Sequence, residues 1–330
     1  MDHPVGMGHP GPVATVRRAV DEFARRFCAT DERWCVALSG GADSLALTAA
    51  AARVRPTVAL IVDHGLQAGS DSVASTARDH AVALGCVAAQ VLRVDVGGRG
   101  GPEAAARAAR YAALEEARGG APVLIAHTLD DQAETVLLGL GRGSGARSIA
   151  GMLPHDPPWG RPLLGVRRAV TQGACEELGL TPWHDPHNVD PRYTRVRLRN
   201  EVLPLLENVL GGGVAEALAR TATGLREDTE ALDGLAADAL AAVLRGAGLG
   251  AELEVAPLAE LPPSIRRRVI RRWLLAGGAS DLTDGQIRGV DRLVVDWRGR
   301  GGVAVGSALR NQRLFAERTG GTLLLRVECV

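Results

Sequence analysis

Short apolar runs alternate with longer segments of helical pattern over the first 140 residues of the chain. The apolar runs have the length of buried strands, and they lie at 34–38, 58–62, 87–94 and 122–126. The segments with helical spacing lie at 13–27, 44–53, 70–84, 102–118 and 130–140. We expect Ser70 to cap the third of these helices. This alternation predicts a doubly wound α/β fold, in which helices cover both faces of a mostly parallel sheet.

The pattern changes near Gly211, where three glycines follow one another. We therefore expect two domains, an α/β domain over 1–208 and a smaller, mainly helical domain over 209–330. In the second domain, 214–244 and 264–275 have the pattern of helices. Short strands joined by a Gly-Gly turn are expected at 303–315 and 322–327.

Polar and acidic residues follow three of the four predicted strands directly. They are S-G-G-A-D-S at 39–44 after the first strand, Asp63 and His64 after the second, and His127, Asp130 and Asp131 after the fourth. The carboxyl ends of parallel strands share one edge of the sheet, and ligands bind outside that edge. The sequence therefore predicts that these residues converge on one site.

The S-G-G-A-D-S loop has the parts of a phosphate cradle. Gly40 and Gly41 allow backbone N–H groups to approach a ligand, and Ser39 and Ser44 add hydroxyl groups beside a helix N-terminus. Asp43 conflicts with this, because a carboxylate ~4 Å from a phosphate costs about 1 kcal/mol even in bulk water. The conflict is resolved if Asp43 holds Mg²⁺, which bridges the acid and the phosphate. The alternative is an ordinary turn between a strand and a helix.

Composition excludes some chemistry. All 38 basic residues are Arg, so the chain can form neither a lysine Schiff base nor a phosphate loop that depends on lysine. The net charge is zero, so local patches must hold any polyanionic partner. Five cysteines without a C-x-x-C pair argue against a disulfide framework or a zinc site. The start has no signal region and no run is long enough for a membrane span, so we expect a cytoplasmic protein without a membrane partner.

The strand, loop and helix around 39–44 resemble the PP-loop of the N-type ATP pyrophosphatases, which cleave ATP between its α- and β-phosphates and adenylate a substrate. Further stretches resemble the tRNA(Ile)-lysidine synthases, which join lysine to the wobble cytidine of a CAU anticodon. These stretches are V-D-H-G-L (62–66), E-A-A-A-R-A-A-R-Y (103–111), A-H-T-L-D-D-Q-A-E-T-V-L-L (126–138) with R-G-S-G (142–145), and D-P-H-N-V-D-P-R-Y-T-R-V-R-L-R-N-E-V-L-P-L-L (185–206).

The resemblance implies a fold like that of the adenine nucleotide alpha hydrolases, with ATP and Mg²⁺ as cofactors. It implies tRNA(Ile) with a CAU anticodon and free L-lysine as partners, and it admits a homodimer. An adenylated cytidine would be the intermediate, and AMP and pyrophosphate would be released. The alternatives are another PP-loop enzyme, either tRNA-modifying or amide-forming, and a non-catalytic ATP-binding regulatory domain.

The resemblance also implies roles for single residues. Asp130 and Asp131 are expected to hold the metal or to orient a substrate, with Asp131 as the candidate base; helix capping is the plain alternative. Either Arg107 or Arg110 is expected at the cytidine or the phosphates. The residues implied in nucleotide binding are Ser39, Gly40, Gly41, Ala42, Asp43, Ser44, Asp63, His64 and His127, with Asp43 and Asp130 as metal ligands.

Two arginine-rich segments are candidates for contact with tRNA. Arg195, Arg197 and Arg199 match the R-N-R-I-R of the family, although Val196 stands where asparagine is usual. These arginines share one face if the segment is extended and spread apart if it is helical. The segment 264–273 would place arginines on one side of a helix and apolar residues on the other. In both segments the alternative is a solvated face that forms salt bridges.

Overall fold

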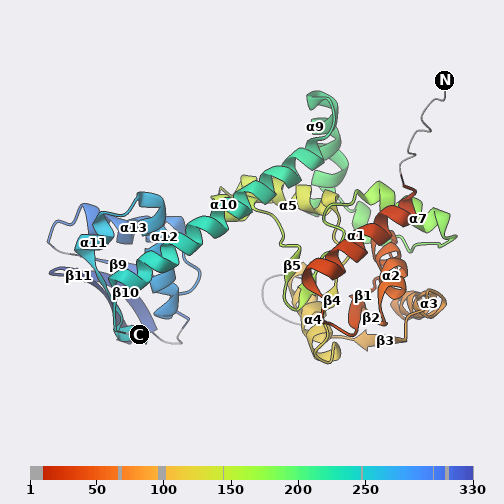
Figure 1. Ribbon diagram of the computed structural model, residues 1–330, viewed down its shortest axis with the longest axis horizontal. Helices are drawn as coiled ribbons and strands as arrows, with labels where there is room; N and C mark the ends of the chain where they lie inside the picture. The colour runs from red at the N-terminus through yellow and green to blue at the C-terminus, as the bar shows by residue number, and fades with distance from the viewer. Residues whose placement is uncertain are drawn as a thin grey trace, which may run out of the picture. The chain divides into compact units, whose positions relative to one another are not determined.

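The computed structural model describes residues 10–65, 69–95, 102–143, 145–246, 248–299, 301–308 and 312–329, without the side chains of 102–104, 187, 188 and 249 (Figure 1). Contacts divide the chain into two compact units. The first ends at Ala222 and the second begins at Thr223, with the short segment 144–147 belonging to the second. The domain boundary expected between 208 and 209 stays a prediction.

A six-stranded sheet forms the centre of the first unit. Its strands are β1 (Trp34–Ala37), β2 (Thr57–Asp63), β3 (Ala88–Arg93), β4 (Val123–Leu124), β5 (His155–Asp156) and β6 (Trp159–Gly160). Their order is β3-β2-β1-β4-β6-β5, and every pair is parallel except β5 with β6. The four predicted strands are confirmed, and the two short strands β5 and β6 carried no recognisable pattern.

The five helices predicted for this unit are also confirmed. They are α1 (Pro12–Phe27), α2 (Ala42–Val54), α3 (Ser70–Ala83), α4 (Pro102–Ala117) and α5 (Leu129–Arg142). The predicted cap of α3 is wrong, because Gly69 is the N-cap residue, with φ +83°, and Ser70 begins the helix. The Ser70 side chain instead hydrogen-bonds to Asp63. Glycine is suited to this position because it adopts positive φ without strain.

Between α5 and α10 the chain forms short helices, which the sequence pattern did not resolve. They are α6 (Ala146–Ile149), α7 (Arg168–Glu177), η1 (Pro186–Val189), α8 (Thr194–Arg197), η2 (Leu198–Val202) and α9 (Leu203–Leu210). The R-V-R-L-R segment lies in α8 and η2, so it is helical and its arginines spread around the axis. Helix α10 (Val214–Val243) follows, as predicted.

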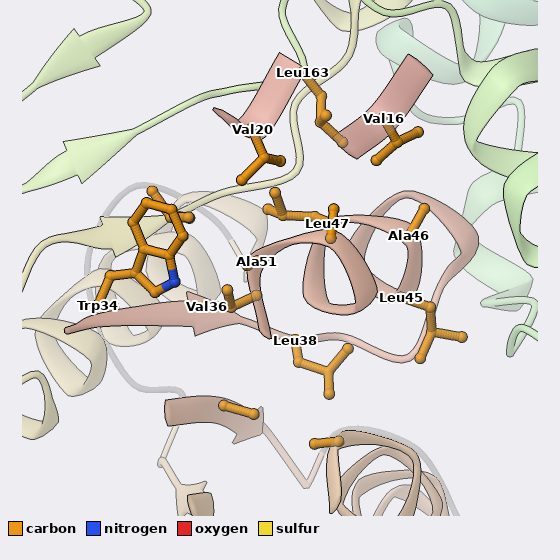
Figure 2. Close-up of a cluster of buried hydrophobic side chains, with 14 of the residues drawn as sticks. Val16, Val20, Trp34, Val36, Leu38, Leu45, Ala46, Leu47, Ala51 and Leu163 are labelled. Carbon is orange, nitrogen blue, oxygen red and sulfur yellow. The ribbon is translucent and has the colours of Figure 1, made fainter. Parts of the chain in front are cut away.

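Residues on β1 alternate between the two faces of the sheet. Trp34, Val36 and Leu38 pack with residues of α1, α2 and α3 in one buried cluster (Figure 2). Cys35 belongs to another cluster on the opposite face, together with Leu114 of α4. Because successive side chains of a strand point to opposite faces, this one strand anchors helices on both sides. The doubly wound α/β fold is therefore confirmed.

The second unit combines helices with an antiparallel sheet (Figure 1). Its elements after α10 are β7 (Leu244–Arg245), η3 (Gly248–Gly250), β8 (Glu252–Glu254), α11 (Val255–Ala259), α12 (Pro263–Ala276), α13 (Asp284–Val295), β9 (Gly302–Val305), β10 (Gln312–Thr319) and β11 (Thr322–Cys329). The sheet order is β7-β8-β11-β10-β9. The predicted C-terminal strands and their Gly-Gly turn are present, and the strands on each side of the turn have eight residues.

In the part of the chain that is described, no single helix combines the length and apolar character needed to cross a membrane. One bent pair, Thr194–Leu210 with Val214–Val243, meets those two criteria jointly.

Candidate active site

A cavity of about 820 Å³ lies in the first unit, where the loops that follow β1, β2 and β4 meet. It collects most of the residues that the sequence singled out. Those in its lining are Ser39, Gly41, Ala42, Asp43, Ser44, Asp63, His64, Arg110, His127, Asp131 and Arg199. Five candidates are not among its described lining residues: Gly40, Asp130, Arg107, Arg195 and Arg197. The expected convergence at the sheet edge is therefore present, although not every candidate takes part in it.

The loop after β1 is held in shape by its own serines. The backbone N–H of Ser39 donates to Oγ of Ser44 at 3.2 Å, and the Ser44 hydroxyl donates to the carbonyl of Gly41 at 2.9 Å. Gly40 has φ +84°, a conformation that favours glycine, and its carbonyl accepts the N–H of Trp183 at 2.9 Å. Helix α2 then begins without a side-chain cap. Its first N–H groups are thus left to a ligand, and an anion is favoured there.

Asp43 and Asp131 are bound by the same guanidinium group. Arg168 donates from Nε to Asp43 at 3.3 Å and from Nη2 to Asp131 at 2.7 Å. The Thr171 hydroxyl, one turn further along α7, also donates to Asp43. No local pattern indicated either α7 residue, since 125 positions separate Arg168 from Asp43.

Electrostatics differ between the two carboxylates. Burial raises the pKa of Asp43 above its usual value, and Asp131 adds to this, against the opposing effects of Arg168 and Thr171. Burial also acts to raise the pKa of Asp131, but Arg168, the Thr128 hydrogen bonds and His127 outweigh it and hold this pKa below its usual value. The negative charge of Asp131 raises the pKa of Asp43, and the Arg168 guanidinium lies between the two carboxylates.

The capping alternative is partly correct for Asp131. Its Oδ2 accepts the N–H and the hydroxyl of Thr128 at 2.8 and 2.7 Å and so completes a capping box at the start of α5. Its Oδ1 faces Arg168 and Arg199. Asp131 therefore caps the helix with one oxygen and faces the cavity side chains with the other.

Asp130 points elsewhere. Its Oδ2 accepts the backbone N–H of Arg168 at 2.7 Å, and its Oδ1 lies 3.3 Å from the Arg167 guanidinium. Arg167 also contacts Glu207 and Glu216, at 3.5 and 3.0 Å. Asp130 thus fixes the first turn of α7 rather than facing Asp43.

Glu134 is a buried acid that the sequence motif contained but to which we had assigned no role. Its side chain has no exposure to solvent and is contacted by three arginines. Arg199 donates to it at 2.8 Å, while Arg168 and Arg195 lie 3.6 Å away. Its position three residues after Asp131 puts both acids on the same face of α5, a spacing that could have identified it.

The three arginines of the R-V-R-L-R segment do different things. Arg199 contacts Asp131 as well as Glu134, whereas Arg195 is partly exposed and also donates to Thr135 at 3.4 Å. Arg197 pairs with Glu201 one turn away, and both side chains are at least half exposed. The helical form of the segment is the reason for this separation.

Asp63 and His64 line another side of the cavity. Asp63 accepts the Gly65 N–H at 3.0 Å, and this bond together with the Ser70 hydroxyl lowers its pKa. Burial lowers the pKa of His64, and the positive charge of Arg110 lowers it further. The Nδ1 atom of His64 is buried and has no hydrogen-bond partner. An unsatisfied buried nitrogen in a cavity wall suits a polar ligand.

Arg110 and Arg107 can now be distinguished. Arg110 lines the cavity, its Nε is buried without a partner, and burial lowers its pKa. Arg107 is exposed, with its guanidinium over the Tyr111 ring and hydrogen-bonded to the Tyr111 hydroxyl at 3.2 Å. His127 lies near both arginines, and burial lowers its pKa to about 3, so its ring is neutral near pH 7. The side chain of Glu103, four residues before Arg107, lies outside the described part of the chain.

The donor chemistry of this site fits Mg²⁺ held jointly with phosphates. One carboxylate oxygen of Asp43 and one of Asp131 lie close together, because they bind the neighbouring Nε and Nη2 atoms of Arg168. Among the described residues there is no cluster of three or more His, Cys, Asp or Glu side chains arranged for a metal. Mg²⁺ commonly binds through one or two carboxylates plus substrate phosphates and water. Two carboxylates are therefore enough ligands for the protein to provide.

Comparison with known proteins assigns both parts of the chain. Residues 12–206 match the family described as "PP-loop domain", and residues 253–318 match the family described as "TilS substrate binding domain". The tRNA(Ile)-lysidine synthase of Mycobacterium bovis is 68% identical over 98% of this chain and 100% of its own length. The enzyme of the same name from Mycobacterium leprae is 67% identical, over 97% of this chain and 98% of its own.

Among solved structures, the U34-tRNA thiolase NcsA from Methanococcus maripaludis is similar with a TM-score of 0.53 and 20% identity. The match covers 66% of this chain and 80% of that one. At this identity the similarity concerns the fold alone, and it agrees with the PP-loop assignment.

Proposed function

The chain belongs to the tRNA(Ile)-lysidine synthase family, and from that premise we propose that it joins L-lysine to C2 of the wobble cytidine in tRNA(Ile) with a CAU anticodon. The observation that supports this most directly is the convergence of the PP-loop, the acids at the strand ends, Arg110 and Arg199 in one cavity. A non-catalytic ATP-binding domain would not need the acids and arginines that line this cavity beside the loop.

The proposed reaction has two steps. The C2 oxygen of the cytidine bonds to the α-phosphorus of ATP, and pyrophosphate leaves. The ε-amine of lysine, after losing a proton, bonds to C2, and the C2 oxygen leaves with AMP. Adenylation is needed because this oxygen is otherwise a poor leaving group.

We assign the ATP phosphates to the PP-loop. The fixed conformation of Gly40 and the two serine hydrogen bonds set the loop in advance, so little ordering is needed on binding. The uncapped start of α2 adds N–H donors and a favourable dipole for the phosphates. Asp63 and His64 lie at the end of β2, and we assign them to the nucleoside side of the ligand.

We assign Mg²⁺ to Asp43 and Asp131, in place of Asp43 and Asp130 as expected from the sequence. Asp130 uses both oxygens on the first turn of α7, whereas Asp131 turns Oδ1 toward Asp43. When bound, the metal would offset the charge of the phosphates beside the carboxylates. The low pKa of Asp131 makes it a poor proton acceptor, so we propose that it acts through its charge rather than as the base.

We assign Arg110 rather than Arg107 to the reacting groups. Both arginines contact Tyr111, but Arg110 lies in the cavity wall with an unsatisfied Nε, while Arg107 is exposed and is not among the described lining residues. A buried guanidinium without a hydrogen-bond partner at Nε can donate to a charge that develops during phosphoryl transfer. Its low-dielectric surroundings strengthen that interaction.

In the second unit, we assign part of the tRNA contact to a basic patch formed by Arg147, Arg268, Arg271 and Arg272. Asp233 is the acid at its centre: its carboxylate contacts Arg147 and Arg268 at 2.6 and 3.4 Å, and its carbonyl accepts from Arg272. Burial lowers the pKa of Arg271, and Arg147 adds to this. One acid cannot neutralise four arginines, so the patch is a suitable partner for RNA phosphates.

Two measurements test the proposed function together. Release of pyrophosphate from ATP, with Mg²⁺, should depend on tRNA(Ile), and labelled lysine should then enter that tRNA. Methionine tRNA, which also has a CAU anticodon, is the matched control. Pyrophosphate release that ignores tRNA, or tRNA(Ile) that never gains lysine, would contradict the proposal.

A further inference from the structure

Arg168 occupies an unusual position for an arginine in a site that must receive a metal. Its side chain is 18% exposed, and it contacts Asp131, Asp43 and Glu134 at 2.7, 3.3 and 3.6 Å. The Nε and Nη2 edge of a guanidinium commonly receives both oxygens of one carboxylate. Here it receives one oxygen each from two carboxylates, which come from α2 and α5.

The cluster around Arg168 is balanced in charge. Asp43, Asp131 and Glu134 supply three negative charges, and Arg168, Arg199 and Arg195 contact one or more of them. Two of the three guanidinium groups are less than one-third exposed. A divalent cation that entered this cluster unaided would add charge to a set that is already neutral, and it would meet repulsion from Arg168.

We propose that Arg168 is the internal counter-ion of Asp43 and Asp131, and that its guanidinium must leave this position before the two carboxylates can hold Mg²⁺. The inference rests on the proposed function, because it takes these carboxylates as the metal ligands. The phosphates of ATP supply negative charge to which the displaced Arg168 guanidinium can turn, whereas Mg²⁺ alone supplies none. Binding of Mg²⁺ without nucleotide is thereby disfavoured.

The structure allows the side chain to move while the helix stays. The first turn of α7 is fixed by groups other than the Arg168 guanidinium. Asp130 accepts the Arg168 backbone N–H, and the Thr171 hydroxyl lies within hydrogen-bond distance of both Asp43 and the Arg168 carbonyl. Further along, Cys175 donates to the Ala42 carbonyl at 3.4 Å. A change at the Arg168 side chain therefore leaves these backbone anchors in place.

The test uses Mn²⁺ as a probe for the metal site, on the full chain without ATP, tRNA or lysine. Binding is followed by the loss of the free Mn²⁺ electron paramagnetic resonance signal. Arg168→Met is expected to bind Mn²⁺ about tenfold or more tightly than the unmodified protein, because a repelling charge within ~4 Å is removed. Mn²⁺ binding that is unchanged or weaker in Arg168→Met overturns the proposal.

Three further variants locate the effect. Arg17→Met removes an exposed arginine that lies 3.9 Å from Asp21, and it should leave Mn²⁺ binding unchanged. Asp43→Asn combined with Arg168→Met should lose the tighter binding; if it does not, the metal binds elsewhere and the proposal is wrong. Arg168→Lys keeps the charge but not the two-pronged contact, so it should bind Mn²⁺ more tightly than the unmodified protein but less tightly than Arg168→Met.

If Arg168→Met does not fold, as judged by circular dichroism, Arg168→Lys decides alone, and binding no tighter than in the unmodified protein overturns the inference. The proposed function has its own readout in lysine incorporation by the unmodified protein. If the protein makes no lysidine but Arg168→Met binds Mn²⁺ more tightly, only the proposed function is contradicted. If the protein makes lysidine but Arg168→Met does not bind Mn²⁺ more tightly, only the counter-ion role of Arg168 is contradicted.

Discussion

Arg199 donates from Nε to Oε1 of Glu134 at 2.8 Å, across 65 positions of sequence, and the Glu134 side chain has no exposure to solvent. This pair joins the segment after α8 to the helix that carries Asp131. Substitutions in and around this pair can therefore distinguish residues that stabilise the fold from residues that act in catalysis.

Replacing Glu134 by glutamine should destabilise the protein by about 3 kcal/mol or more, because three arginines would then face a site without its negative charge. Urea denaturation followed by circular dichroism measures this. The matched control is Glu201→Gln, which removes an acid from the exposed pair with Arg197 and should leave the denaturation midpoint almost unchanged. Equal effects of the two substitutions would contradict the buried ion cluster.

Asp131→Asn should reduce pyrophosphate release by ~100-fold or more, and Asp130→Asn by much less. The reason is that Asp131 faces Asp43 across Arg168, whereas Asp130 holds the first turn of α7 and Arg167. Initial rates with saturating tRNA(Ile) and varied Mg²⁺ measure the difference. A larger loss in Asp130→Asn would restore the metal assignment that the sequence suggested.

Arg110→Ala should slow the adenylation step more than Arg107→Ala does. Arg110 lines the cavity with an unsatisfied Nε, while Arg107 is exposed and is not among the described lining residues. Single-turnover release of pyrophosphate compares them, and an expected loss of ~100-fold for Arg110→Ala follows from the cost of one donor to developing charge. Similar rates in both variants would remove Arg110 from the reacting groups.

His127 predicts a pH dependence of stability. Its pKa is about 3 in the folded protein, while an unfolded histidine takes up a proton near pH 6.5. The unfolded state therefore binds more protons between these values, and stability falls as the pH drops through that window. Asp131, with its lowered pKa, stays ionised in both states above pH 5.

Comparison with His127→Gln isolates this effect. Between pH 7.0 and 5.5 the unmodified protein should lose about 1 kcal/mol more of its free energy of unfolding than the variant does. Urea denaturation at the two pH values provides the numbers. If the two proteins respond equally, His127 is not buried in its neutral form.

The basic patch of the second unit predicts a salt-dependent contribution to tRNA binding. Arg268→Ala combined with Arg272→Ala should weaken binding of tRNA(Ile) and reduce the slope of log K against log salt by about 1 per lost phosphate contact. Arg288→Ala is the matched control, since Arg288 pairs with Asp284 on the exposed side of α13. Filter binding at several salt concentrations measures the slopes. An unchanged slope in the double variant would exclude the patch.

Local sequence was enough to predict most strands and helices of the first unit, because each depends on the spacing of apolar residues that are neighbours in the chain. Four strands and five helices of the first unit follow from apolar spacing alone, and the loop at 39–44 follows from two glycines between a strand and a helix. The short strands β5 and β6 have two residues each, too few for any periodicity. Helix α7 was missed as well, and it carries Arg168.

The order of strands and loops is enough to predict which residues can gather at the edge of the sheet, since the ends of parallel strands must meet there. The different contacts of the neighbouring acids depend on the fold. Asp130 and Asp131 are neighbours in sequence, yet successive positions on a helix differ in direction by about 100°. One therefore faces the start of α7, while the other faces Arg168 and Asp43. Contacts such as these join residues far apart in sequence, and no local pattern can express them.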